Sequence, residues 1–513
     1  MKQISRRGLL RTGMAAGVLA ATGVPTLAQS RGGTLRLGLA GANTSDSWDG
    51  RTHSDTYMIV CAMGAVFDCL TEIAANGELV GELAESWEAT PDAKTWIFNL
   101  RQGVTFHNGA AFTADDVIAS LNLHVAEGSQ SAAAPIVAAI TEMTKLGDYQ
   151  VQFVLEAGNA DFPFLLSDYH LLMYPHASIE EAIANGIGTG LYRNVSFDPG
   201  VRTVLQRVDG HYKDGQAGWF DSIEVIAIND GSARMTALMT GQVDAVNNVV
   251  FQTEPLMRAN PAIEVMDVTG NQHYSFPMLT NLSPLDNVNV RQALKYAVDR
   301  QELVDKVLQG HGAVANDHPI GPANQYYFAE LEQNSYDPDR AKAMLQAAGL
   351  DGLNIDLSVS DAAFAGAVDA GLLYQAKAAD CGININVVQE AADGYWSNVW
   401  LKKPWCASYW SGRVTEDWMF TLGYQTGAAW NDTNWENERF QSLLLEARAE
   451  LDSAKRREMY YEMQMLCSQE GGVVIPMYAN FVTANSTKLS HPETVGNVYD
   501  LDSSRIAERW WMA

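Results

Sequence analysis

Segments with the two-residue periodicity of strands alternate along this chain with helical segments, and this alternation limits the fold more than any other feature. Residues 33–40, 201–208 and 222–228 alternate in the manner of strands, and a short amphipathic helix follows the third of them. Farther along, two strand-like segments, 353–359 and 383–388, enclose a helix. Because the alternation falls into two blocks, we expect two lobes of the α/β class.

Several further segments carry start and stop signals for helices. Thr113 has the residue type of an N-cap, and Asp115 and Asp116 follow it in the first turn, where the helix dipole favours acidic side chains. An amphipathic pattern over residues 232–240 ends at Gly241. The other predicted elements are strands over 95–106, 243–250 and 473–478 and helices over 290–309, 339–348 and 439–469, the last broken at 451–453.

The chain is strongly acidic. It has 61 Asp and Glu against 34 Lys and Arg among 513 residues, and its formal net charge is −27. Binding to a phosphate backbone or to anionic lipid needs basic patches, so this charge argues against nucleic acid and anionic membranes as partners. No run of about 18 or more apolar residues follows the first thirty residues, so we expect no membrane-spanning segment in the mature chain.

The first 28 residues have the order of a secretory signal. Residues 5–10 read Ser-Arg-Arg-Gly-Leu-Leu and precede an apolar stretch over 13–27, after which Ala28 is the expected cleavage position. Adjacent arginines followed by two leucines resemble a twin-arginine signal, which exports folded proteins. An ordinary signal that contains two arginines is the alternative. Both interpretations predict export, and the twin-arginine one predicts the bacterial periplasm.

Catalytic and metal-binding motifs are mostly absent from the mature sequence. It contains no H-E-x-x-H, no G-x-S-x-G, no P-loop and no C-x-x-C, so we expect no catalytic residue, no metal and no cofactor. His311 and His318 are the nearest suggestive pair, and their spacing of seven residues is poor for a metal site. Cys61 and Cys69 either form a disulfide in an oxidising compartment or remain buried free thiols.

Seven segments match, in the same order, the motifs of one family. Residues 188–192 read Gly-Thr-Gly-Leu-Tyr, with Leu191 where the family has proline, and residues 290–300 fit the pattern V-R-x-A-x-x-x-A-x-D-R. The seven segments are 83–88, 95–109, 112–117, 188–192, 238–244, 285–300 and 336–341. Together they resemble the extracellular solute-binding proteins, family 5, which are the dipeptide, oligopeptide and nickel receptors of ABC importers.

This resemblance implies a two-lobed periplasmic binding protein fold of type II, in the large cluster C form. Lobe I is then residues 31–272 plus 484–513, with an extra subdomain at about 56–180, and lobe II is residues 273–483. Two strand-like crossings, near 273–281 and 479–485, would join the lobes. Such lobes close on a ligand in the cleft, which excludes water and strengthens the polar contacts inside.

One departure from the family carries the prediction of the ligand. In the peptide receptors, an aspartate directly after W-x-G pairs with the α-amine of the ligand. Here Trp410-Ser411-Gly412 is retained, but the next residue is Arg413. A guanidinium cannot accept a hydrogen bond from an ammonium group, whereas it holds a carboxylate or phosphate through two parallel charge-assisted bonds. We therefore expect Arg413 to face the cleft and to anchor an anionic group.

The alternative arrangement has Arg413 pointing outward or paired with Glu416 or Asp417. One of these carboxylates would then recognise an amine, so a zwitterionic ligand also fits. Aromatic side chains crowd the same segment, and flat rings offer stacking and cation–π contact, although a single Trp is more often part of a core. The candidate ligand-binding residues are Arg413, Trp410, Tyr409, Trp418, Trp430, Asn431 and, by family position, His273, Tyr274 and Asn43.

The sequence thus predicts an exported, monomeric receptor that captures a small organic solute and delivers it to an inner-membrane ABC permease. The simplest solute is a short peptide or a carboxylate-bearing amino-acid derivative such as an opine. A nickel-chelate or oligosaccharide receptor of the same fold is one alternative. A secreted hydrolase of peptide or cell-wall material is the alternative from another class, and it would need a nucleophile–base pair or a carboxylate dyad.

Overall fold

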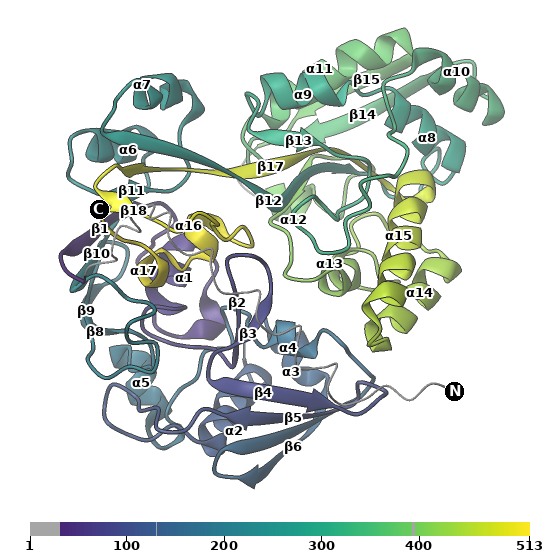
Figure 1. Cartoon of the computed structure of the whole chain (residues 1–513). Coiled ribbons are helices and arrows are strands. Elements are labelled where there is room, and N and C mark those ends of the chain that lie inside the picture. Colours follow the sequence, from purple (N-terminus) through teal and green to yellow (C-terminus); the bar gives the residue numbers. More distant parts are fainter. Residues whose placement is uncertain (1–30, 130, 392–394) are drawn as a thin grey trace, which may run out of the picture.

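Two long strands join two lobes, as Figure 1 shows for this computed structural model, which describes residues 31–129, 131–391 and 395–513. β12 (Ile263–Pro277) and β17 (Val473–Ser486) pair antiparallel over nearly their whole lengths. Their register shifts between Val268 and Gln272, in the stretch that lies between the lobes. The predicted signal peptide, residues 1–28, lies outside the described residues.

The largest sheet begins in lobe I and continues into lobe II. Its core in lobe I is β1, which pairs parallel with β10 and with β11, and β12 and β17 carry the sheet across. The strands in sheet order are β16 (Ser408–Trp410), β12, β17, β11 (Ala245–Val246), β1 (Thr34–Leu39), β10 (Ser222–Ala227), β9 (Arg202–Arg207) and β8 (Tyr192–Asp198), and β13 (Gly312–Val314) also pairs with β17.

A second, four-stranded antiparallel sheet lies at the far end of lobe I (Figure 1). It has its own apolar core, which extends from Leu70 to Met173 along the chain. Helix α1 (Thr56–Ala62) packs instead with the β1 and β10 side chains. The strands in sheet order are β4 (Ala84–Ala89), β5 (Thr95–Leu100), β7 (Gln150–Leu155) and β6 (Ile140–Gly147), with α2 (Ala114–Asn122), α3 (Ala134–Ala138) and α4 (Phe162–Leu165) beside them.

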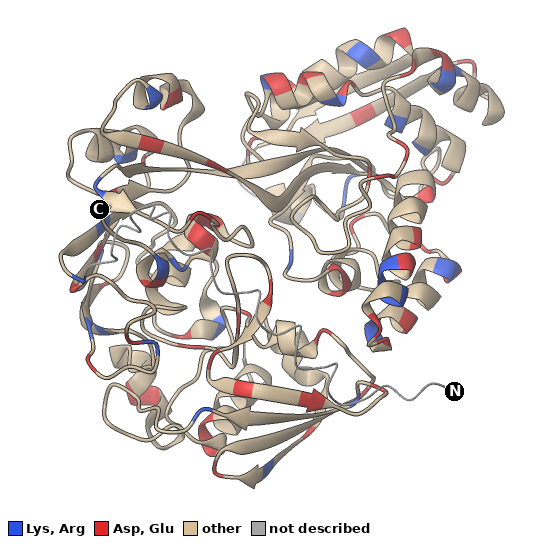
Figure 2. Cartoon of the chain, in the orientation of Figure 1, with Lys and Arg blue, Asp and Glu red and all other residues tan. Residues whose placement is uncertain are grey.

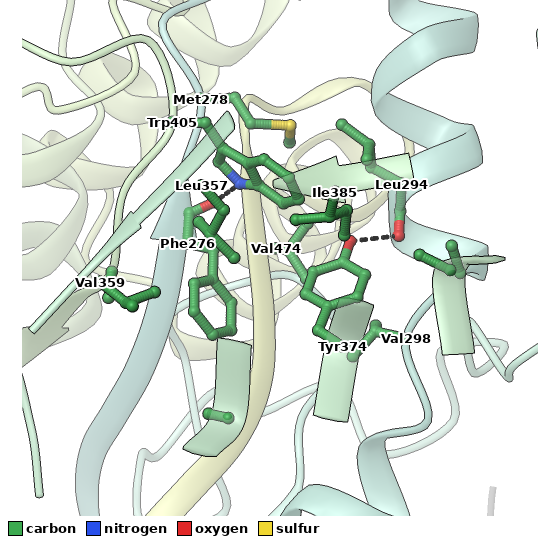
Figure 3. Packing of buried hydrophobic residues seen from close by; sticks show 14 of the residues in the cluster. Phe276, Met278, Leu294, Val298, Leu357, Val359, Tyr374, Ile385, Trp405 and Val474 are labelled. Atoms are coloured by element: carbon green, nitrogen blue, oxygen red, sulfur yellow. Dashed lines mark hydrogen bonds between the residues drawn. The ribbon is translucent and has the colours of Figure 1, made fainter. Parts of the chain in front are cut away.

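Lobe II is built around the parallel pair β14 (Leu353–Val359) and β15 (Ile383–Gln389), joined by α11 (Ala367–Asp380). Figure 3 shows its core, where the Trp405 indole lies 5.4 Å from the Tyr374 ring in an edge-to-face arrangement. The polar atoms of both side chains are satisfied: the indole N–H donates to the Phe276 carbonyl at 3.3 Å, and the phenol donates to the Leu294 carbonyl. This core therefore holds buried aromatic groups without an orphaned donor.

Four predicted elements differ from the structure in length. The strand predicted over 95–106 ends at Leu100. The helix predicted over 290–309 is two helices, α8 (Val288–Tyr296) and α9 (Arg300–Lys306), because Asp299 caps the second by accepting a hydrogen bond from the Glu302 amide. The strand predicted over 473–478 continues to Ser486, since β17 pairs with β12 in both lobes. The strand predicted over 243–250 shrinks to β11, which contacts its neighbours over two residues only.

The remaining helices and strands lie close to their predicted positions or fill the loops between them. They are α5 (Ile179–Asn185), α6 (Gly231–Met239), α7 (Glu254–Arg258), α10 (Pro338–Ala347), α12 (Tyr395–Asn398), α13 (Glu416–Gly423), α14 (Glu438–Ala449), α15 (Ser453–Glu470), α16 (Asp500–Ser503), α17 (Ile506–Arg509), β2 (Thr71–Ile73), β3 (Leu79–Gly81), β18 (Leu489–Ser490), β19 (Trp511–Met512) and the 3-10 turns η1 (Gly50–Thr52), η2 (Leu123–Val125), η3 (His176–Ser178) and η4 (Phe251–Thr253).

Two of the open questions about the chain are answered by the structure. Cys61 and Cys69 are both buried free thiols, so the disulfide alternative is wrong. Within the described ranges, no helix combines the length and the apolar character needed to cross a bilayer. Figure 2 shows basic residues scattered among acidic ones in both lobes, in keeping with the net acidic charge.

Candidate ligand-binding site

A tight turn at the end of β16 carries Arg413. β16 is the edge strand of the large sheet, and it pairs with β12 so that Trp410 lies opposite His273. Gly412 has a φ of 78°, and a Cβ atom there would collide with Asn271, so glycine is required at this position. The Asn271 amide donates to the Arg413 carbonyl at 3.0 Å and fixes the turn. The retained Gly412 therefore allows the tight turn that sets the backbone position of Arg413.

One edge of the Arg413 guanidinium has no partner among the residues that the structure describes. Its Nη1 donates to the Gly412 carbonyl at 2.6 Å and lies 3.4 Å from the Ser411 hydroxyl. Its central carbon lies 5.4 Å from the centre of the Trp410 ring. Among the described residues no acceptor bonds Nε or Nη2, and no carboxylate forms an ion pair with this side chain. These two nitrogens form an edge that accepts a carboxylate in parallel geometry.

The positive charge of Arg413 affects the pKa values of two lobe I residues, Asp168 and Tyr169. Burial opposes ionisation of Asp168, but the charges of His170 and Arg413, together with hydrogen bonds from His170, outweigh it and lower the Asp168 pKa. Burial raises the pKa of Tyr169, and Arg413 opposes that shift while Tyr409 adds to it. The charge of Arg413 in lobe II therefore reaches Asp168 and Tyr169 of lobe I.

Next to this turn, the two lobes enclose a cavity of about 50 Å³. Its walls include Ile73, Asp161 and Asn271 from lobe I and Asn324 and Thr415 from lobe II. Pockets for organic ligands usually measure about 300–1,000 Å³, so this cavity alone is too small for a dipeptide. A solute of that size needs more room than this cavity provides, and Val414, the residue after Arg413, is part of the cavity wall.

Among the described residues, neither Glu416 nor Asp417 pairs with Arg413. Both side chains are buried at the start of α13. Glu416 accepts a hydrogen bond from the Tyr326 amide at 2.7 Å, and Asp417 accepts from Arg448 at 3.0 Å. Burial raises the pKa of Glu416 to about 7 and that of Asp417 to about 6. These carboxyls are committed to partners within lobe II.

A buried contact holds the lobes together at the α4 end of the cleft. Asp161 of lobe I forms an ion pair with Arg456 of α15 at 2.6 Å. The Ala160 amide donates to the Arg448 carbonyl at 2.6 Å. Trp418 packs into the apolar core of the four-stranded sheet, although its own helix belongs to lobe II. We name this contact, between Asp161, Arg456 and Trp418, the interlobe clasp. Trp418 therefore has a packing role in lobe closure. No contact among the described residues places Trp418 against a solute.

The predicted aromatic candidates divide into a buried and an exposed group. Trp410 is buried, and its indole N–H lies 3.4 Å from an oxygen of Asp432, a residue that the sequence analysis did not select. Tyr409 and Trp430 are exposed. The Trp430 ring centre is 6.1 Å from that of Trp410. A signal for Asp432 is present in the sequence, since it lies between Trp430 and Trp435.

The other predicted residues have local roles. Tyr274 stacks on Phe364 at 4.2 Å, and both ring nitrogens of the fully buried His273 lack a partner among the described residues. Burial, with His318 nearby, lowers the His273 pKa to about 3. The Asn431 amide nitrogen donates to two carbonyls of its own loop, and its oxygen accepts from the Thr433 hydroxyl. Its predicted contact with a ligand therefore gains no support. Asn43 is exposed and shapes a turn by accepting from the Ser45 hydroxyl.

One cluster in lobe I has the composition of a metal site but already contains cations. Asp68, Glu82 and Glu508 bring ligand oxygens within 4.8 Å of one another. Lys213 lies 2.8 Å from Glu82 and 2.9 Å from Glu508, and Arg505 lies 2.7 Å from Glu82. The ammonium and guanidinium groups take the place that a metal would need, so the cluster anchors the C-terminal segment to lobe I.

His311 also has a structural role, at the outer side of the hinge. Its Nδ1 lies 2.7 Å from Asp267 of β12, and its Nε2 lies 2.8 Å from Glu254 of α7. Burial opposes protonation of His311, but hydrogen bonds to Asp267 and Glu254 outweigh it and raise the pKa. Because His311 leads into β13, this triad ties lobe II to lobe I.

We expect the contribution of His311 to depend on pH. Since its folded-state pKa lies above the ordinary value of 6.5, the stabilisation is complete below that pH and is lost as pH rises through the folded-state pKa. The variant H311Q should lower the free energy of unfolding by about 1–2 kcal/mol at low pH and by less at high pH. Denaturant titrations across the pH range measure this, with H176Q, which changes an exposed histidine beside the buried Asp116, as control. A cost that does not change with pH would contradict the prediction.

The fold defines a class: a binding protein of two lobes joined by two long strands. The chain belongs to the bacterial extracellular solute-binding proteins, family 5, whose middle-region model matches residues 78–432. The predicted family and fold class are confirmed. Members of this family are extracytoplasmic binding proteins that serve ABC importers, so the receptor role follows while the solute does not.

Individual relatives differ in what their names say they bind. The dipeptide-binding protein of Escherichia coli (strain K12) is 28% identical over 440 residues, which cover 78% of this chain and 80% of that protein. HbpA2 from Haemophilus parasuis has a TM-score of 0.80 at 22% identity, covering 90% of this chain and 96% of that one. AgaA from A. tumefacien R10, solved with agropinic acid, has a TM-score of 0.77 at 22% identity, covering 94% and 99%. At these identities the two structures establish the fold alone.

Proposed function

We propose that this receptor captures a small organic solute that carries a carboxylate, either a short peptide or an amino-acid derivative such as an opine, and presents it to an inner-membrane ABC permease. The observation that carries the proposal is the free Nε and Nη2 edge of Arg413, whose charge reaches Asp168 of lobe I and which has no ion pair among the described residues. Arg413 is half-buried in the structure, and further burial of its charge on closure is costly unless an anion pairs with it.

The binding cycle requires no chemical step. A solute enters between the lobes, its acidic group pairs with Arg413, and closure at the interlobe clasp removes water from that pair. Exclusion of water strengthens the pairing, because charges attract more strongly in a less polar medium. Names of relatives support this solute class, since one is a dipeptide-binding protein and another was solved with agropinic acid. Export by the twin-arginine route and a monomeric state complete the proposal.

Native mass spectrometry of the protein purified from its own host tests the proposed solute class. We expect a co-purified molecule of low mass that bears at least one carboxylate and that is released unchanged on unfolding. Recovery of a neutral sugar or of a metal chelate without a free acid group would contradict the proposal. Incubation of the released molecule with fresh protein separates receptor from hydrolase, because a receptor returns it intact and a hydrolase returns products.

A further inference from the structure

A patch of exposed aromatic rings lies beside the Arg413 turn. Within the ranges that the structure describes, Trp396, Tyr409 and Trp430 are the only aromatic side chains that remain highly exposed, at 41%, 40% and 45%. Single exposed rings need no explanation, but three in one place mark an interaction site. Tyr409 lies opposite Tyr274 of β12, one of the two strands that join the lobes, so the patch adjoins the hinge and the Arg413 turn.

The three rings form one connected group. Trp396 lies 5.6 Å from Tyr409 and 5.8 Å from Trp400, measured between ring centres. Trp430 lies 6.2 Å from Trp400 and 6.1 Å from Trp410. All four contacts are close to edge-to-face, so the rings meet at steep angles. We call these five rings the aromatic group. Rings at steep angles surround a cation better than a flat stack does.

A buried carboxylate lies behind the aromatic group. One oxygen of Asp432 accepts hydrogen bonds from the Trp400 indole at 3.2 Å and from the Trp410 indole at 3.4 Å. Asp432 is 7% exposed, and no Lys or Arg of the described chain forms an ion pair with it. Burial raises its pKa to about 6, against those two hydrogen bonds. A negative charge with only neutral donors as partners makes the neighbouring space favourable for a cation.

We propose that the aromatic group and Asp432 form a second subsite, which binds an organic cation, either ammonium or guanidinium, of the same solute. This rests on the proposed function, because Arg413 holds the acidic end. Arg413 covers the Trp410 ring at 5.4 Å, so the cation meets the exposed rings of Trp430, Tyr409 and Trp396. The solute is then zwitterionic, with opposite charges on the two sides of Trp410, as at the two ends of a short peptide.

A pair of probes with equal shape and different charge tests this subsite. 4-Trimethylammoniobutanoate and 5,5-dimethylhexanoate both carry a carboxylate, and they differ by the replacement of nitrogen with carbon. In calorimetric titrations of the full chain we expect the cationic probe to bind about tenfold or more tightly than the neutral one. The variant D432N should reduce this preference below about threefold.

Further variants separate a failure of this subsite from a failure of the proposed function. Trp430→Leu removes an exposed ring, leaves both Asp432 hydrogen bonds in place, and should also reduce the preference for the cationic probe. Thermal unfolding of each variant checks that it folds. Equal binding of the two probes, or a preference that survives D432N and Trp430→Leu, would overturn the cation subsite and leave the Arg413 anchor standing. Binding of neither probe at millimolar concentration would overturn both.

Discussion

The variant R413A should weaken binding of the co-purified solute by at least about tenfold. Truncation of one side of a desolvated charge pair costs about 2 kcal/mol or more, because the partner charge is left buried without compensation. The folded state should be unaffected, since Arg413 makes no ion pair with any described residue. Calorimetric titration of wild type and variant with that solute measures the loss.

Arg457, an exposed arginine of α15 in the same lobe, offers a matched control for this experiment. R457A removes the same charge from the same lobe at a position away from the cleft, so its affinity should equal that of wild type. R413K is informative as well, because an ammonium keeps the charge but loses the parallel pair of donors. Its affinity for the solute should lie between those of wild type and R413A. An R413A affinity within a factor of about three of wild type would exclude the anchor role.

The second large effect is expected at the interlobe clasp. The variant R456M keeps an apolar stem under Tyr326 and Tyr460 and removes the partner of Asp161. Loss of one member of a buried ion pair costs about 3–5 kcal/mol, and opening of the lobes relieves that cost by returning Asp161 to water. We therefore expect a shift toward the open form, with a larger radius of gyration in solution scattering and affinity lower by about 100-fold.

A double variant distinguishes the clasp from a general loss of stability. In D161N/R456M the buried carboxylate is absent too, so closure should recover part of the lost affinity, and the two single effects should not add. R457M at the adjacent exposed position serves as control. If R456M binds the solute as tightly as wild type, or if the two single effects add, the clasp does not govern closure.

Local signals in the sequence predicted most of the regular elements. α10 begins at Pro338 behind the capping residue Asp337, and the gap between α14 and α15 coincides with the cap at Asp452. These signals act within one turn of the chain, so they need no knowledge of the rest of the fold. The length of β17 was not predictable in this way, because it is set by pairing with β12, which lies far away in sequence.

The candidate site was predictable in part for the same reason. The W-x-G motif placed Arg413 at a turn, and the φ of 78° at Gly412 shows why a glycine precedes it. The partners of Glu416 and Asp417 come from Tyr326 and Arg448, so their commitment required the folded chain. The roles of Asp432 and of the interlobe clasp were not predicted, because the partners of these buried charges come from other segments of the folded chain.

A crystal structure of the protein with its co-purified solute tests the central claim most directly. The account predicts an unaltered molecule enclosed by both lobes, with an acidic group bonded to Nε and Nη2 of Arg413. A solute that lies elsewhere on the molecule, or one in the cleft whose acidic group leaves that guanidinium without a partner, would contradict it.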